Sequence, residues 1–125
     1  MPIHFTIDHD KRYVKARAEG ETGLADVEKF LDAVVVQNAL PYKKLFDGRR
    51  AIAKYNDSDV MMLGARMSAY ASNFERRGAA AFIVPDEAAS DLAKRFINLA
   101  KVEHPVRIFL SEDEARQWLA AQPEI

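Results

Sequence analysis

A short polar stretch, Asn56-Asp57-Ser58-Asp59, holds the side chains whose types and spacing could do chemistry. A serine hydroxyl can accept a phosphoryl group, which adds as many as two negative charges. The same residue types also accept hydrogen bonds from the free amides at the start of a helix. The sequence therefore allows two interpretations: Ser58 is a phosphoacceptor at a helix start, or Asp57 or Ser58 is an ordinary N-cap.

A basic cluster precedes this stretch and consists of Lys43, Lys44, Arg49, Arg50 and Lys54. Within it, Lys44, Arg49 and Arg50 are candidates for binding an anion such as a phosphate or a lipid head group. The alternative is a solvated strand and loop, because local runs of charge usually lie on the surface. No glycine-rich phosphate loop or dinucleotide fingerprint accompanies the cluster, so the sequence does not support nucleotide chemistry.

The histidines give little support for a metal centre or a catalytic triad. His4 and Asp8 share one face of a strand, but four residues of rise separate them by about 13 Å, too far to bind one ion. His104 stands beside a proline, with no serine nucleophile next to it in the sequence. We therefore predict no metal, no cofactor and no catalytic residues.

Length and composition predict one domain that covers residues 1–125. The chain has 125 residues, of which 49% are hydrophobic, and this is enough for a core without cross-links. It has no cysteine, which excludes thiol chemistry and fits a reducing cytoplasm. A net charge of -1 gives no overall attraction to nucleic acid. No apolar run approaches the roughly 20 residues of a membrane span, so we expect a cytoplasmic protein without membrane insertion.

The hydrophobic periodicity predicts where the elements lie. Two-residue alternation predicts an antiparallel hairpin from residues 3–7 and 14–18. Helical spacing predicts helices over 24–38, 60–74 and 86–99, and Ser111 with Glu114 predicts a capped start for a fourth helix. Further strands are expected over 43–49, 79–84 and 106–110, although Asp47-Gly48 could form a turn instead.

The resulting order is strand, strand, helix, strand, helix, strand, helix, strand, helix. Helices that connect successive strands in this way require parallel neighbours in one sheet. The predicted class is therefore α/β, with a mixed but mostly parallel sheet of about five strands that begins with an antiparallel hairpin. About four helices are expected to pack on this sheet.

Two segments resemble a known family. Leu45-Phe46-Asp47, followed by Asn56-Asp57-Ser58-Asp59-Val60, resembles the STAS domain, named for sulfate transporters and anti-sigma factor antagonists. Residues 106–119 are similar to the last strand and helix of its SpoIIAA-like branch, which is often grouped with CRAL-TRIO lipid-binding proteins. The resemblance implies a SpoIIAA-like fold, no assigned catalytic residues, and a serine at the start of the second helix that can be phosphorylated. By analogy alone it also allows a homodimer.

Met62 adds an apolar candidate to the same helix start. It shares its helix face with Arg66, so we expect it to be partly exposed, where its adaptable thioether could contact a partner. The leading hypothesis is a non-enzymatic regulatory or protein-interaction module that acts through Asp57, Ser58 and Met62. The partner itself is not identified by the sequence.

The alternative hypothesis is a carrier or sensor of a small amphiphilic, lipid-like ligand. In it, the apolar part of the ligand lies beneath the second and third helices, and its anionic end lies near Arg49 and Arg50. Such a ligand needs an apolar cavity of roughly 300 Å³ or more, and a chain of this length leaves little spare volume. This consideration favours the interaction module.

Overall fold

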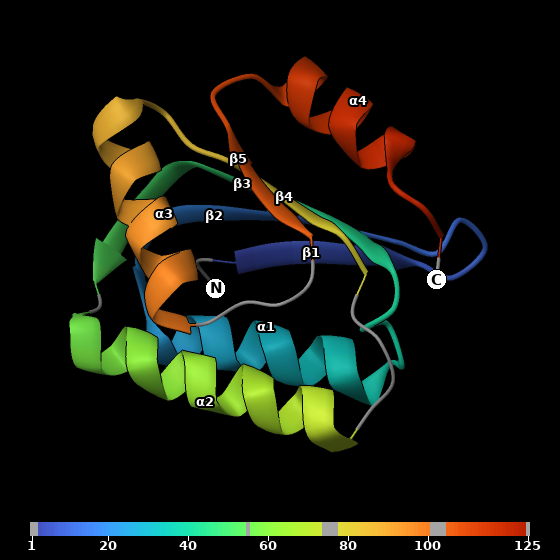
Figure 1. The fold of residues 1–125 in the computed structure, drawn as a ribbon, viewed down its shortest axis with the longest axis horizontal. Coiled ribbons are helices and arrows are strands. Elements are labelled where there is room, and N and C mark those ends of the chain that lie inside the picture. The colour runs from blue at the N-terminus through green and yellow to red at the C-terminus, as the bar shows by residue number, and fades with distance from the viewer. Residues whose placement is uncertain (1–2, 55, 74–77, 101–104, 125) are drawn as a thin grey trace.

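The computed structural model describes residues 3–54, 56–73, 78–100 and 105–124. Its elements follow one another in the predicted order (Figure 1). They are β1 (Ile3–Asp8), β2 (Tyr13–Gly23), α1 (Leu24–Val36), β3 (Lys43–Lys54), α2 (Asp57–Asn73), β4 (Ala80–Ile83), α3 (Glu87–Ala100), β5 (Val106–Phe109) and α4 (Glu112–Ala121).

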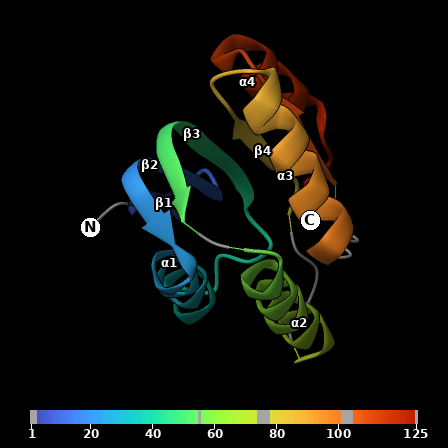
Figure 2. The same ribbon diagram turned by 90° about the vertical axis from the view of Figure 1, so that its left-hand side faces the viewer.

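One sheet contains all five strands, in the spatial order β1-β2-β3-β4-β5. The β1–β2 pair is antiparallel and the other three pairs are parallel, which confirms the predicted α/β class. Figure 1 shows α4 on one side of the sheet and α1 and α2 on the other. The view in Figure 2 shows α2 beside α1, with α3 next to it. The two faces of the sheet are therefore covered unequally.

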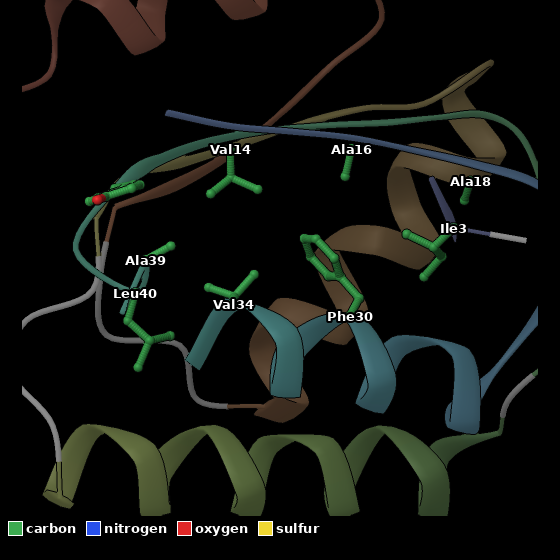
Figure 3. Packing of buried hydrophobic residues seen from close by; sticks show 9 residues of the cluster. Ile3, Val14, Ala16, Ala18, Phe30, Val34, Ala39 and Leu40 are labelled. Atoms are coloured by element: carbon green, nitrogen blue, oxygen red, sulfur yellow. The ribbon is translucent and has the colours of Figure 1, made fainter. Parts of the chain in front are cut away.

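The larger part of the core lies between α1 and the first strands. Val14, Ala16 and Ala18 alternate along β2, and Figure 3 shows their side chains pointing toward Phe30 and Val34 of α1. All five side chains are buried. This is the arrangement expected when a strand with a two-residue period packs against a helix with an apolar stripe.

A second buried cluster lies under α4 on the opposite face. Leu45 of β3 and Ile83 of β4 pack there with Ala115 and Leu119 of α4. The neighbouring Phe46 packs against the α1 cluster instead. Consecutive residues of β3 therefore point to opposite faces of the sheet, and Leu45 points to the face that α4 covers.

β3 is longer than the sequence predicts, because it runs to Lys54 and Asp47-Gly48 does not form a turn between elements. Arg17 of β2 pairs with Asp47 and Glu19 pairs with Arg50, so two residues of β3 lie opposite one residue of β2. This is a β-bulge, which keeps both strands paired while it bends the longer one. Gly48 lies in the bulge, and Asp47 stays paired with Arg17 just before it.

β3 also extends past its other neighbour. β4 pairs with β3 only from Lys44 to Asp47, whereas β2 continues to pair with β3 from Arg50 to Lys54. We call the paired residues 19–23 and 50–54 the β2–β3 extension. It is a two-stranded ribbon that leads directly into the segment before α2.

The predicted start of the last helix is confirmed by its first hydrogen bond. Ser111 precedes α4 in an extended conformation, and its hydroxyl accepts a hydrogen bond from the amide of Glu114 at 3.4 Å. Three acidic residues occupy the first turn, where the helix dipole favours negative charge.

Candidate functional site

The start of α2 is fixed by a reciprocal pair of hydrogen bonds. The Asn56 side-chain oxygen accepts from the amide of Asp59 at 2.9 Å, and the Asp59 carboxylate accepts from the amide of Asn56 at 3.0 Å. Asn56 is therefore the N-cap, and the interpretation of Asp57 or Ser58 as the cap is wrong. Asp57 and Ser58 are the first and second residues of the helix, because the Asn56 side chain already occupies the cap position.

Asp57 and Ser58, which do not cap the helix, are both exposed. The Asp57 carboxylate forms an ion pair with Arg95 of α3, an arginine that the sequence analysis did not single out. Both side chains are more than half exposed, so this pair adds little to stability. It brings the Arg95 guanidinium to the residue that precedes Ser58 in the sequence.

The next turn of α2 presents two adjacent thioethers. Met61 and Met62 are 61% and 59% exposed, whereas Val60 and Leu63 on either side of them are only 5% and 1% exposed. Met62 is thus exposed as its helix face predicts, and Met61 joins it. The helix is anchored by one face and displays soft apolar groups on another.

α2 is also tied to α1 by charge. Arg66 of α2 forms ion pairs with Glu28 and Asp32 of α1, the second at 2.6 Å. A guanidinium that spans two carboxylates orients the two helices more firmly than a single pair would. The side chains at the start of α2 are therefore presented on a positioned helix.

The basic cluster does not gather at one place. The Lys44 ammonium donates to the carbonyl oxygens of Leu40 at 2.6 Å and Tyr42 at 2.8 Å, and it thereby holds the loop before β3. Five residues of strand place Lys44 roughly 16 Å from Arg49. Of the three anion-binding candidates, only Arg49 and Arg50 lie together.

Arg49 is occupied by two carboxylates. Its guanidinium donates to Asp47 through two nitrogens, at 2.7 and 3.0 Å, and to Glu112 of α4 at 3.1 Å. The hydrogen bond from Arg49 holds the pKa of Asp47 below its ordinary value of 3.8. The hydrogen bond from Arg116 similarly lowers the pKa of Glu112. The bulge of β3 is thus joined to the start of α4 by alternating charges.

An open groove of about 590 Å³ lies over the bulge and is lined by Arg17, Ala18, Glu19, Asp47, Arg49 and Arg50. Arg17 and Asp47 share the face of Leu45, so the groove is on the α4 side of the sheet, away from α2 and α3. Within the described ranges no carboxylate forms an ion pair with Arg50. The groove is charged, unlike the apolar space that a lipid tail requires.

The histidines on the described chain are not gathered around an ion site. His9 lies 2.8 Å from the Tyr42 hydroxyl, measured from its Nδ1, and the two rings pack edge to face. Groups of three or more potential metal-ligating side chains do not occur among the described residues. His104 lies outside them.

Among the helices of the described residues, none has both the length and the apolar character that a membrane-spanning segment needs.

Comparison with known proteins finds similarity in structure only. No protein-family model matches the chain, and no curated protein matches its sequence. An uncharacterized protein of the DUF3478 family from Shewanella loihica PV-4, described as having a SpoIIAA-like fold, superposes with a TM-score of 0.60. The two chains are 20% identical, and the match covers 94% of this chain and 93% of the other.

The anti-sigma factor antagonist SpoIIAA, in its unphosphorylated form, superposes with a TM-score of 0.58. It is 15% identical, and the match covers 96% of this chain and 99% of SpoIIAA. At these identities the similarity establishes a shared fold. The SpoIIAA-like fold predicted from the sequence is therefore confirmed.

Proposed function

We propose that this chain is a non-enzymatic regulatory module that binds a protein partner through the start of α2. The observation that carries the proposal is the exposure of Met61 and Met62 beside the exposed Ser58. Exposed thioethers adapt to many shapes and are favoured at binding surfaces. The likeness of the fold to that of an anti-sigma factor antagonist is consistent with a module of this kind.

The spacing of these residues supports one continuous surface. In a helix, residues four apart lie above one another, so Ser58 lies beside Met62 and Asp57 beside Met61. A partner that covers the two methionines therefore also covers the serine hydroxyl and the carboxylate. This combines an apolar contact with a polar group that can be modified.

Phosphorylation of Ser58 would act on that surface as a switch. A phosphoserine adds roughly two negative charges, and repulsion from Asp57 and Asp59 at about 5 Å in water is about 3 kcal/mol before screening. The helix dipole returns only about 0.3 to 1 kcal/mol per charge. Arg95 offsets part of the repulsion through Asp57. The modified serine should loosen the helix start or repel the partner.

Site-specific photo-crosslinking in the native cell tests this proposal. A photoreactive amino acid at position 62 should capture one protein reproducibly, whereas the same group at the exposed Lys29 of α1 should not. The captured protein, once purified, should bind the wild-type chain directly and bind a Ser58→Asp variant at least about tenfold more weakly, as 1.4 kcal/mol of lost interaction requires.

Purification of the chain from its own cell also distinguishes the two hypotheses, an interaction module and a carrier of a small amphiphile. Native mass spectrometry of the chain isolated gently from its own cell should show the bare mass or a protein complex. A reproducibly retained small amphiphile, together with equal crosslinking from positions 62 and 29, would contradict the proposal. Peptide mass spectrometry of the same material reports whether Ser58 carries phosphate.

A further inference from the structure

The outer edge of the β2–β3 extension is a feature that the proposed function does not use. β4 stops pairing with β3 at Asp47, and from Arg50 onward β3 pairs with β2 alone. In the described chain no strand covers the other side of β3 here. An edge of this kind offers backbone N–H and C=O groups with which an extended peptide can pair.

The pairing pattern identifies the backbone groups that face outward. The Lys44 amide donates to the carbonyl oxygen of Ala79 at 2.9 Å, so the backbone of Lys44 faces the β4 side. Lys44 and Phe46 are two residues apart and share this orientation. Phe46 and Ala51 both pack on the α1 cluster, because the bulge shifts the alternation by one residue. The backbone groups of Ala51 and Ala53 therefore face the outer edge.

The side chains that alternate with these two alanines form a regular pattern on the α4 side of the sheet. Arg50, Ile52 and Lys54 are two residues apart and point to one face. Ile52 is 55% exposed, Arg50 is exposed, and Lys54 forms an exposed ion pair with Glu21 at 3.7 Å. The edge thus displays a cation, an apolar group and a second cation in sequence.

We infer that this edge binds an extended acidic segment of another protein, which adds to the sheet as a strand beside β3. Acidic side chains four residues apart would lie opposite Arg50 and Lys54, and an apolar residue midway between them would cover Ile52. Cross-strand pairs of opposite charge stabilise such an added strand, and the backbone of Ala51 and Ala53 supplies its hydrogen bonds.

A second copy of this chain fits the edge less well. Antiparallel pairing that uses all the outward-facing groups joins Ala51 of one copy to Ala53 of the other. That register is centred on Ile52 and places Arg50 of each copy opposite Lys54 of its neighbour. Like charges directly opposite one another destabilise a strand pair, so the charges favour an acidic partner over self-association.

Backbone NMR of the ¹⁵N-labelled full chain tests the inference with a synthetic probe, acetyl-Glu-Thr-Val-Thr-Glu-amide, whose first, third and fifth side chains share one face of a strand. Addition of the peptide should shift the amide signals of Ala51 and Ala53 and slow their hydrogen exchange. Ala51→Pro should abolish binding, because it removes an outward N–H without removing a hydrogen bond to β2. Arg50→Glu should weaken binding about fivefold, and the exposed control Lys29→Glu should not weaken it.

Charge reversal keeps the test decisive even if Ala51→Pro fails to fold. The Arg50→Glu/Lys54→Glu variant should prefer acetyl-Lys-Thr-Val-Thr-Lys-amide over the acidic peptide. Unchanged Ala51 and Ala53 signals at millimolar peptide, or binding that ignores the charge reversal, would overturn the inference. Concentration-dependent self-association that Arg50→Glu strengthens would assign the edge to a second copy instead. Crosslinking from position 62 is a separate readout, so each proposal can fail alone.

Discussion

The start of α2 and the bulge of β3 are both rich in charged and polar side chains, but they use these side chains differently. At α2, Asn56 and Asp59 bind each other's amides three residues apart. At the bulge, Arg49 binds Glu112, which is 63 residues further along the chain. Local hydrogen bonds leave the methionines of α2 available, whereas distant ion pairs occupy an arginine that looked available in the sequence.

The difference between anchored and displayed residues of α2 should give the largest effect. Leu63 is 1% exposed, so Leu63→Ala should lower the free energy of unfolding by about 2 to 5 kcal/mol. Met62→Ala should change it by less than about 0.5 kcal/mol, because the side chain is mostly in solvent. Urea unfolding followed by circular dichroism measures both. Equal losses in the two variants would mean that Met62 is part of the core.

The assignment of the N-cap gives a smaller, equally direct effect. Asn56→Ala should cost about 1 kcal/mol of stability, since it removes the acceptor for the Asp59 amide. Ser58→Ala should cost less than about 0.5 kcal/mol, because the hydroxyl is exposed and does not cap the helix. Thermal and urea unfolding of the two variants make the comparison. A larger loss of stability in Ser58→Ala than in Asn56→Ala would show that Ser58, and not Asn56, caps the helix.

The ion pair at the bulge should give the smallest effect and depend on pH. Asp47→Asn should destabilise the protein by about 0.5 kcal/mol at neutral pH and low salt, as for other partly exposed pairs. The folded pKa of Asp47 lies below 3.8, so its contribution is complete above that pH and is lost as the pH falls through the folded value.

Unfolding measured across the acid range should therefore show wild type and Asp47→Asn converging at low pH. Added salt should reduce the difference at neutral pH, because it screens exposed charges. A difference that stays constant from neutral to strongly acidic pH would show that the amide substitution acts through packing rather than charge.

Elements whose signals are local could be predicted from the sequence. The hairpin follows from alternation at residues 3–7 and 14–18, and the start of α4 follows from Ser111 and Glu114. The exposed position of Met61 could also have been predicted. Met61 lies one residue, or about 100°, around the helix from Val60. Val60 is at the flank of the apolar stripe, so Met61 falls outside the stripe.

Features that depend on distant partners could not be predicted in this way. Nothing near Asp57 in the sequence indicates Arg95, which reaches it from another helix. The continuation of β3 past Gly48 depends on β2, which supplies the pairing that turns a turn-like dipeptide into a bulge. The availability of Arg50 likewise follows only from how the neighbouring carboxylates are distributed.

The affinity of the purified crosslinked partner for surface variants tests the central claim most directly. Isothermal titration calorimetry should show that Met62→Asp binds at least about tenfold more weakly than wild type, because it places a charge in an apolar contact. The matched substitution Lys29→Asp on α1 should leave the affinity unchanged. Wild-type affinity in Met62→Asp, or an equal loss in both variants, would contradict the assignment of the start of α2 as the recognition surface.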